Sequence, residues 1–127
     1  MNGMTVLYVD GADDSRNRLA RFIAGYTESL FTARDGREGV LAFIACRPEL
    51  VVADVALLGQ DGRHLAACIR NLQPAVPIVF LAGAPGNLAD FEEFDPDIDR
   101  VLARPVDLAA FSRLLAGYRG VLRDSVA

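Results

Sequence analysis

Residues 48–62 read PELVVADVALLGQDG, and this stretch is the most informative one for predicting the fold. Within it, residues 50–53 are apolar without interruption, and the run ends on a carboxylate, Asp54. A continuous apolar run of this kind is typical of a strand buried on both faces, as in a parallel sheet covered by helices. Similar or shorter runs predict four more strands, at Met4–Val9, Ser29–Ala33, Ile78–Ala82 and Val101–Ala103.

Between the strands, apolar residues recur at the spacing of amphipathic helices. Asp13 or Asp14 is expected to cap the first helix and Asp107 the last, because a carboxylate can accept hydrogen bonds from free backbone N–H groups. Five alternating strand–helix units with short connections predict an α/β domain with a parallel sheet between two layers of helices. The predicted helices are Arg16–Tyr26, Glu38–Ala45, Arg63–Leu72, Leu88–Phe94 and one after Asp107 that carries Leu108, Phe111, Leu115 and Tyr118 on one stripe.

The length and composition are those of one globular domain. The chain has 127 residues, of which 52% are hydrophobic, and this is enough to bury a single core. No apolar run approaches the roughly 20 residues that span a bilayer, and residues 1–4 lack the basic start of a secretory signal. The two cysteines, Cys46 and Cys68, match no metal-binding spacing and indicate a reducing compartment. We therefore expect a cytoplasmic protein that does not contact a membrane.

Charge narrows the class of partner. The chain has 13 basic and 17 acidic residues and a formal net charge of −4, whereas proteins that bind nucleic acid without sequence preference are usually basic. All 13 basic residues are arginine, so chemistry that needs a lysine, such as a Schiff base, is excluded. The single histidine, His64, has no second ligand at metal-binding spacing and is expected to be exposed and inert.

The residues at the carboxyl ends of the predicted strands indicate a functional site. In an open, doubly wound sheet, ligands bind at this edge, beside the point where the strand order reverses. Asp10 follows the first strand, Asp54 the third and Arg104 the last, while the fourth strand ends on Ala82. Packing gives no reason for buried strands to end repeatedly in charge. We therefore expect Asp10, Asp54 and Arg104 to form one cluster.

Together, these motifs resemble the receiver domain of two-component response regulators over essentially the whole chain. The family implies a flavodoxin-like (βα)5 fold with a doubly wound parallel sheet in the strand order 2-1-3-4-5. We expect a receiver-like domain at residues 1–120 and a C-terminal tail, or the start of a linker, at residues 121–127. The resemblance rests on VLYVDGADDSR at residues 6–16, ARDG with Glu38 at the second turn, residues 48–62, PIVFLA at residues 77–82, and Arg104-Pro105.

The resemblance also implies roles for the acidic residues. Asp54 stands at the position of the phosphoacceptor aspartate, and Asp10 at the first position of the acidic pair that holds Mg²⁺. Gly11 occupies the second position, where the family has a metal ligand. A folded-back Asp13 or Asp14 would supply the missing carboxylate; the alternative is a helix cap with a solvated charge. We expect Mg²⁺ binding to be weak or absent, because this ion demands near-octahedral oxygen coordination.

Four further positions depart from the family pattern. Ala82 replaces the serine or threonine whose hydroxyl contacts the phosphoryl group, and Val101 replaces the aromatic residue whose rotation reports phosphorylation. Arg104 replaces the family's lysine; it keeps the positive charge and can form a bidentate pair with Asp54. Leu58 stands where a proline is usual. These departures predict a degenerate phosphorylation site.

Two stretches of sequence bear on partners. Residues 90–99 hold six acids and no base, and we expect a solvated surface there. On the last helix, the face opposite the apolar stripe carries small side chains, which either let another backbone approach closely or merely make an exposed, alanine-rich helix. In the family, the surface of the fourth helix, fifth strand and fifth helix is a common dimer and partner surface, which predicts a homodimer. The predicted interface residues are Ala109, Arg113, Ala116 and Gly117.

Two functions are compatible with the sequence. The first is a signalling domain that is not an enzyme and acts through dimerisation and protein–protein interaction, with a histidine kinase or a downstream signalling protein as its partner. The second is a working phosphoacceptor, phosphorylated on Asp54 by a histidine kinase. A haloacid-dehalogenase-type phosphatase is disfavoured, because its second aspartate would follow Asp10 by two residues and Asp13 follows by three. A flavodoxin is disfavoured because these carboxylates would repel the phosphate at its first loop.

Overall fold

The computed structural model describes residues 4–54, 60–83 and 94–126, and for residues 60–63 and 121–126 it describes the backbone alone. Five strands form one sheet in which every neighbouring pair is parallel, in the order β2-β1-β3-β4-β5. The predicted doubly wound sheet with the strand order 2-1-3-4-5 is therefore confirmed. The strands are β1 (Met4–Val9), β2 (Thr27–Ala33), β3 (Leu50–Asp54), β4 (Ile78–Ala82) and β5 (Arg100–Ala103).

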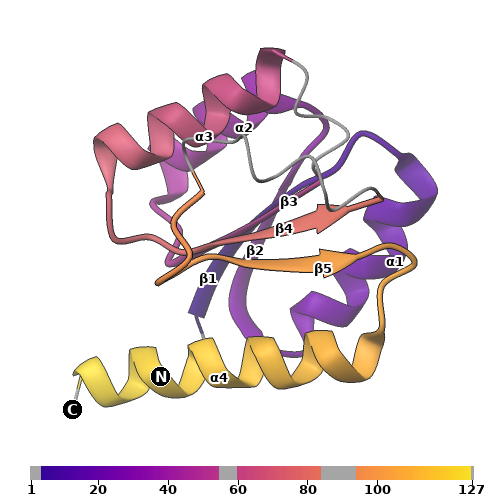
Figure 1. Cartoon of the computed structure of the whole chain (residues 1–127), viewed down its shortest axis with the longest axis vertical. Helices are drawn as coiled ribbons and strands as arrows, with labels where there is room; N and C mark the ends of the chain where they lie inside the picture. Colours follow the sequence, from indigo (N-terminus) through magenta and orange to yellow (C-terminus); the bar gives the residue numbers. More distant parts are fainter. Residues whose placement is uncertain (1–3, 55–59, 84–93, 127) are drawn as a thin grey trace.

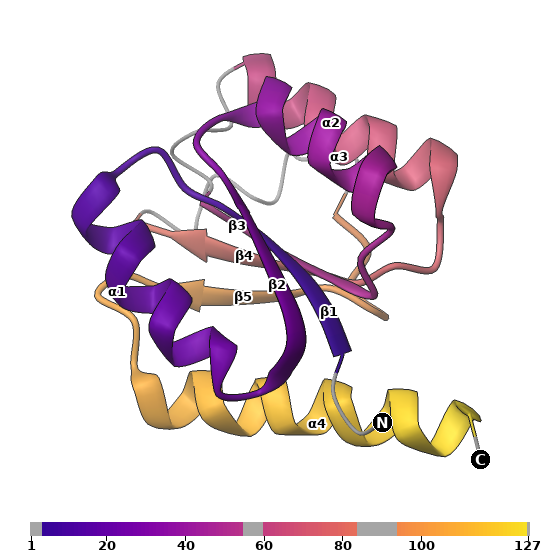
Figure 2. The ribbon, with the colours of Figure 1, turned by 180° about the vertical axis from the view of Figure 1, so that it is seen from behind.

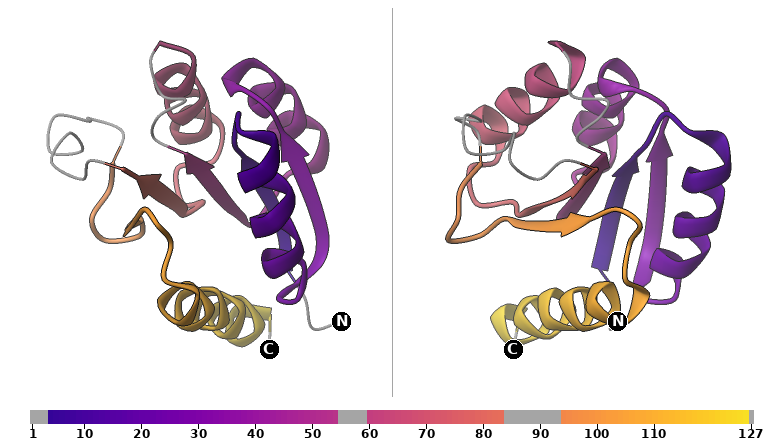
Figure 3. Two further views of the ribbon diagram at one scale, coloured as in Figure 1. Left: turned by 90° about the vertical axis from the view of Figure 1, so that its right-hand side faces the viewer. Right: turned by 45° about the vertical axis from the view of Figure 1, so that its right-hand side comes forward.

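Helices cover both faces of the sheet (Figures 1 and 2). Two of them, α2 and α3, lie side by side on one face, while α1 and α4 lie on the other, and Figure 3 shows the sheet between these layers. The helix predicted over Leu88–Phe94 lies outside the described residues, apart from Phe94 itself. No helix in the described ranges has both the length and the apolar character needed to cross a bilayer. The described helices are α1 (Asp13–Ala24), α2 (Gly36–Cys46), α3 (Gln60–Leu72) and α4 (Leu108–Val126).

The sheet divides the core into two layers. On one face, Leu7 of β1 packs in a cluster with Phe43 of α2 and Ile69 of α3. The next residue, Tyr8, points to the other face and packs in a cluster with Phe111 of α4. Since successive strand residues face opposite sides, both sides of the sheet must be apolar to be buried. This is why the central strands β1, β3 and β4 consist almost entirely of apolar residues.

The helix ends differ in part from the prediction. Ala12 is the N-cap residue of α1, so Asp13 and Asp14 lie in the first turn and neither side chain caps the helix, contrary to the prediction. Carboxylates in a first turn still stabilise the helix through its dipole. Asp107 does cap α4 as predicted, since its Oδ1 accepts a hydrogen bond from the backbone N–H of Ala109 at 2.9 Å.

The last helix is longer than the sequence suggested. It continues to Val126, so residues 121–126, expected to form a tail or linker, are helical. These residues read VLRDSV and contain neither glycine nor proline, the residues that most readily interrupt a helix. The third helix, α3, also differs from the prediction, because it begins at Gln60 and not at Arg63.

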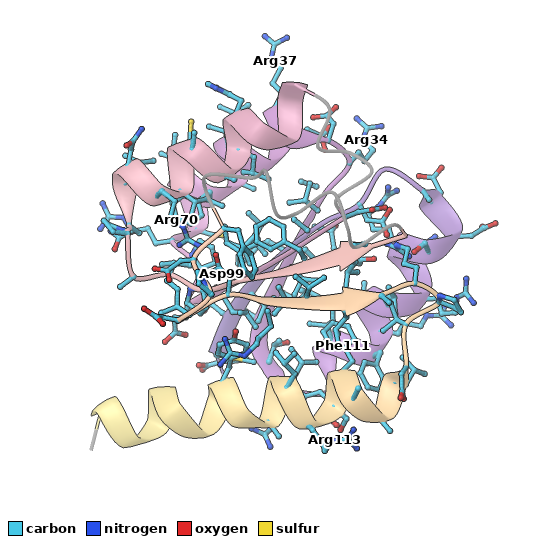
Figure 4. The ribbon with its side chains drawn as sticks, in the orientation of Figure 1. Arg34, Arg37, Arg70, Asp99, Phe111 and Arg113 are labelled. Carbon is cyan, nitrogen blue, oxygen red and sulfur yellow. The ribbon has the colours of Figure 1, made fainter. Side chains whose placement is uncertain are left out.

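In the described part of the acidic stretch, residues 94–99, Asp99 is not solvated, which corrects the prediction of a solvated surface at this residue. Asp99 is buried and forms an ion pair with Arg70 of α3, and Figure 4 shows the two side chains close together. Its Oδ1 accepts a hydrogen bond from the N–H of Ile78, and its Oδ2 accepts one from the N–H of Asp95, both at 2.8 Å. The guanidinium of Arg70 also donates to the carbonyl of Val76 at 2.7 Å. The pair therefore joins the end of α3 to the starts of β4 and β5.

Candidate functional site

Three charged side chains meet at the carboxyl ends of the strands. Asp10 follows β1, Asp54 closes β3 and Arg104 follows β5. Because all strands are parallel, these ends share one edge of the sheet. The Nη2 atom of Arg104 lies 3.1 Å from Oδ2 of Asp10 and 3.2 Å from Oδ2 of Asp54. The structure therefore brings together the three residues that we expected to form one cluster.

The contact between Arg104 and Asp54 differs from the expected geometry. A bidentate pair would place two guanidinium nitrogens on the two oxygens of one carboxylate. Instead, Nη2 is shared between Asp10 and Asp54, and Nη1 donates to Oγ of Ser15 at 3.0 Å. Burial alone would lower the pKa of Arg104, but the facing carboxylates of Asp54 and Asp10 raise it. One permanently charged cation thus lies between two carboxylates.

Asp10 is fully buried and has a donor on each oxygen. Its Oδ2 accepts hydrogen bonds from the hydroxyl of Tyr8 at 2.5 Å and of Ser15 at 2.9 Å, and its Oδ1 accepts one from the N–H of Ala12 at 2.9 Å. Burial alone would raise the pKa of Asp10, but these bonds and the charge of Arg104 outweigh it and hold the pKa below its usual value. Asp10 is therefore a carboxylate at neutral pH.

Tyr8 and Ser15 belong to the site but are not among the residues predicted from the sequence. Burial, together with the hydrogen bond to Asp10, raises the pKa of Tyr8, so its hydroxyl stays protonated and donates. A sequence signal exists for Tyr8, because residues two apart on a strand point to the same face. No such signal exists for Ser15, whose position depends on the path of the loop after β1.

Asp13 does not join the cluster as the replacement ligand that the sequence suggested. Its Oδ1 lies 2.5 Å from Nη2 of Arg16, and its side chain is 78% exposed. Arg16 also donates from Nη1 to the backbone carbonyl of Asp10 at 2.9 Å. The carboxylate of Asp13 is therefore paired with an arginine at the surface, and Asp14 is likewise exposed.

The cluster offers carboxylate oxygens, the kind of ligand that Mg²⁺ prefers, from Asp10 and Asp54. Within residues 4–54, 60–83 and 94–126, no group of three or more His, Cys, Asp or Glu side chains could hold a metal ion. Gly11 offers no side-chain oxygen, and Oδ2 of both Asp10 and Asp54 contacts the guanidinium of Arg104. A divalent cation that keeps near-octahedral oxygen coordination would have to enter where a positive charge already lies.

The two expected switch positions carry small apolar side chains. Ala82 is fully buried at the end of β4, opposite Ala103 of β5, and its methyl group can neither donate nor accept a hydrogen bond. Val101 is partly buried and packs against the core cluster on the α2–α3 side of the sheet. Leu58, the remaining departure from the family pattern, lies outside the described residues.

The predicted interface residues lie on the outer face of α4. There is open space within 4 Å of the position that a Cβ on Gly117 would take. A hollow of about 300 Å³ lies beside Gly117, between Arg100 and Tyr118. Figure 4 shows Arg113 pointing away from the sheet. The residues Ala109, Arg113, Ala116 and Gly117 are all exposed.

The sequence resembles known regulators over most of its length. Residues 6–116 match the family model of the response regulator receiver domain. The chain is 30% identical over 118 residues to the response regulator MprA of Mycolicibacterium vanbaalenii, which covers 93% of this chain and 50% of that protein. It is 31% identical over 119 residues to a protein-glutamate methylesterase/protein-glutamine glutaminase of Desulfitobacterium hafniense, which covers 87% of this chain and 30% of that protein. The chain thus spans half or less of the length of these relatives.

Solved structures share the fold. The N-terminal domain of an uncharacterized protein from Wolinella succinogenes has a TM-score of 0.83 at 17% identity and covers 96% of this chain and 98% of its own. A response regulator receiver protein from Sinorhizobium medicae has a TM-score of 0.79 at 19% identity, with 93% and 95% covered. These likenesses show the fold, and the match over residues 6–116 shows the family. The chain belongs to the response regulator receiver domain family of two-component signal transduction.

Proposed function

We propose that this receiver domain acts mainly as a protein–protein interaction and dimerisation module, with little or no control by phosphorylation and no enzymatic activity of its own. The observation that carries the proposal is the position of Arg104, whose Nη2 lies within 3.2 Å of carboxylate oxygens of both Asp10 and Asp54. An internal cation takes the place that a metal ion and a phosphoryl group would share. The partners would be a second copy of the chain and a histidine kinase or downstream signalling protein.

Weak or absent Mg²⁺ binding is part of this proposal. Receiver domains typically bind Mg²⁺ through the carboxylates of their acidic pocket. In this chain Gly11 supplies no carboxylate, and the carboxylates of Asp10 and Asp54 contact Arg104. To admit the ion, the guanidinium would have to release both Asp10 and Asp54. If it stayed, two positive charges would lie a few ångströms apart in a partly buried site, where Coulomb repulsion is stronger than in water.

The absence of a phosphorylation switch follows from the side chains at two positions. A ligand shifts an equilibrium only by its differential affinity for the two states. The methyl group of Ala82 cannot bond a phosphoryl oxygen on Asp54, and Val101 has no aromatic ring that could exchange an exposed and a buried position. A phosphoryl group on Asp54 would therefore make nearly the same contacts in two alternative conformations, and it would shift the equilibrium between them only slightly.

The outer face of α4 supports the proposed dimer. Ala109, Ala116 and Gly117 are exposed where a surface helix usually carries long charged side chains, and Arg113 is the exception. Small side chains allow two helices to approach closely and leave few rotamers to order on association. The family surface also includes the helix predicted over Leu88–Phe94. Apart from Phe94, that stretch lies outside the described residues.

The proposal is tested by sedimentation of the wild-type chain, Asp54→Ala and Asp54→Glu, each with and without acetyl phosphate and Mg²⁺. We expect the three proteins to share one oligomeric state, with dissociation constants within about twofold of each other, because Ala82 and Val101 cannot transmit a change at residue 54 to the surface of the domain. A pull-down of a histidine kinase or downstream signalling protein that binds the wild-type chain should give equal yields with all three proteins.

The competing function is a working phosphoacceptor, and one observation favours it. Asp54 ends β3 at the sheet edge with its side chain 12% exposed, beside a cation that could neutralise a phosphoryl group. A change in assembly upon addition of acetyl phosphate, abolished in Asp54→Ala, would establish this function and overturn the proposal.

Ala116→Glu is expected to weaken the dimer. In a two-fold symmetric interface the substitution occurs twice, so two carboxylates would face each other, and we expect the dissociation constant to rise about tenfold or more. The matched control is Ala45→Glu, which places the same change at an exposed alanine on α2. Sedimentation over a range of concentrations measures both variants. Equal dissociation constants for the two variants would show that the dimer does not use α4.

A further inference from the structure

The outer surface of α2 and α3 carries apolar side chains that the proposed function does not use. Leu41 is 65% exposed, Ile44 56% and Leu72 51%. Leu41 and Ile44 lie three residues apart on α2 and therefore share one face of the helix, while Leu72 ends α3. In the described part of the chain, the other large exposed apolar side chains, Phe31 and Leu108, lie on β2 and α4. A cluster of this kind marks an interaction surface.

These side chains border two hollows that follow one another along α2. One, of about 570 Å³, lies where α2 and α3 end, with Ile44 and Leu72 among its lining residues. The other, of about 390 Å³, lies nearer the start of α2 and is lined by residues that include Leu41 and His64. The 11 residues of α2 give a length of about 16 Å. We call the two hollows together the α2–α3 groove, and Figure 2 shows the helices that form its walls.

The rim of the α2–α3 groove is basic, although the chain as a whole carries a net charge of −4. Arg47 lines the hollow with Ile44 and Leu72, Arg37 lines the hollow with Leu41 and His64, and both arginines are exposed. Figure 4 shows Arg37 pointing away from the ribbon. The carboxylates near the ends of α2 are engaged: Glu38 pairs with Arg34 at 2.8 Å, and Glu49 accepts a backbone hydrogen bond from β1 at 2.9 Å.

We propose that the α2–α3 groove docks an amphipathic helix of a partner protein, with apolar side chains in the two hollows and flanking carboxylates facing Arg37 and Arg47. In helix-in-groove recognition, an amphipathic helix places apolar side chains from successive turns into a hydrophobic groove. A second copy fits less well, because two concave grooves that both carry exposed arginines do not complement each other in shape or in charge. The concave shape also disfavours a lipid surface. This surface lies across the sheet from α4, so the proposal does not depend on the proposed dimer.

The test uses three synthetic peptides of about 18 residues as probes. The first is an amphipathic helix with leucine on one face and glutamate on its flanks, the second carries lysine in place of every glutamate, and the third is a scrambled glutamate peptide. Binding is followed by the amide chemical shifts of the intact chain at low ionic strength. We expect the glutamate peptide to shift the amides of α2 and α3 and to bind about tenfold or more tightly than the other two, with a loss of affinity in high salt.

Matched variants separate the groove from the rest of the surface. Arg37→Glu should weaken binding of the glutamate peptide about fivefold and favour the lysine peptide, and Leu41→Ser should weaken both. Arg113→Glu and Leu108→Ser, the same changes at exposed positions of α4, should leave binding unchanged. The proposal is overturned by the absence of shifts on α2 and α3, by equal binding of the three peptides, by self-association that Leu41→Ser abolishes, or by binding to anionic phosphatidylglycerol vesicles in place of the peptide.

Discussion

Arg104→Leu is expected to lower the free energy of unfolding at neutral pH by about 3 kcal/mol, because it leaves two neighbouring carboxylates without their cation. Asp10 is fully buried and the side chain of Asp54 is 12% exposed, so water would replace the guanidinium only in part. Breaking a buried ion pair typically costs about 3–5 kcal/mol. We expect the lower end of this range, since the side chain of Arg104 is 26% exposed. Urea unfolding at pH 7 measures the loss.

The pH dependence of that loss separates charge from packing. In the wild-type chain, the pKa of Asp10 is lowered from 3.8, so its contribution to stability is complete above this value and is lost as the pH falls through the folded-state pKa. Without Arg104, we expect the pKa of Asp10 to rise above the unfolded-state value, because burial beside a second carboxylate disfavours its charged form. The folded variant then binds protons more readily than the unfolded chain, and its stability relative to the wild type should recover as the pH falls from 7 towards 4.

Two matched variants complete this prediction. Arg104→Lys keeps a cation in the site and should cost about 1 kcal/mol, through the loss of the forked hydrogen bonds. Arg113→Leu removes an exposed arginine of α4 and should change stability by no more than about 0.5 kcal/mol. A loss in Arg104→Leu that is equal at pH 7 and pH 4, or no larger than that of Arg113→Leu, would contradict the proposed role of Arg104.

Asp99→Ala is expected to have an effect of similar size, about 3–4 kcal/mol, at the opposite edge of the sheet. The carboxylate accepts hydrogen bonds from the N–H groups of Ile78 and Asp95 and pairs with Arg70, whose side chain is 17% exposed. Alanine would leave the two N–H groups without this acceptor and would remove the negative charge that faces the guanidinium. Urea unfolding of the variant measures the effect.

The control for Asp99→Ala is Asp97→Ala, which removes an exposed carboxylate from the same turn. Substitutions at exposed sites usually change the free energy of unfolding by no more than about 0.5 kcal/mol. If both variants lost the same amount, Asp99 would not have the structural role that its burial and its partners indicate.

The strands could be predicted from the sequence more closely than the helix ends. All five strands begin and end within two residues of the predicted bounds. The central strands β1, β3 and β4 are predicted most closely, because burial on both faces requires continuous apolar runs. The first helix was predicted from Arg16 but begins at Asp13, since Ala12 takes the N-cap position. There the N–H of Ala12 donates to the carboxylate of Asp10 at 2.9 Å, a contact that periodicity does not reveal.

In the site, the topology predicted which residues meet but not how they pair. Parallel strands bring Asp10, Asp54 and Arg104 to one edge, and this follows from strand assignment alone. The shared contact of Arg104, by contrast, depends on Ser15, which takes the second guanidinium nitrogen.

Asp99 could not be predicted as a buried residue for a related reason. Its ion-pair partner, Arg70, lies 29 residues earlier in the sequence, on α3. A run of acidic residues indicates a solvated surface, and the run itself does not reveal that Asp99 is buried.

The most direct test of the central claim, that Arg104 occupies the place of the metal ion and the phosphoryl group, is a titration of the chain with Mg²⁺ and beryllofluoride. Beryllofluoride stands in for the phosphoryl group on an aspartate, and amide chemical shifts report its binding. We predict no saturable shifts around Asp54 at millimolar Mg²⁺ in the wild-type chain. We predict that they appear in the triple variant Gly11→Asp, Ala82→Thr, Arg104→Lys, which restores the family's residues. Saturable shifts in the wild-type chain that spread from Asp54 to α4 would contradict the claim.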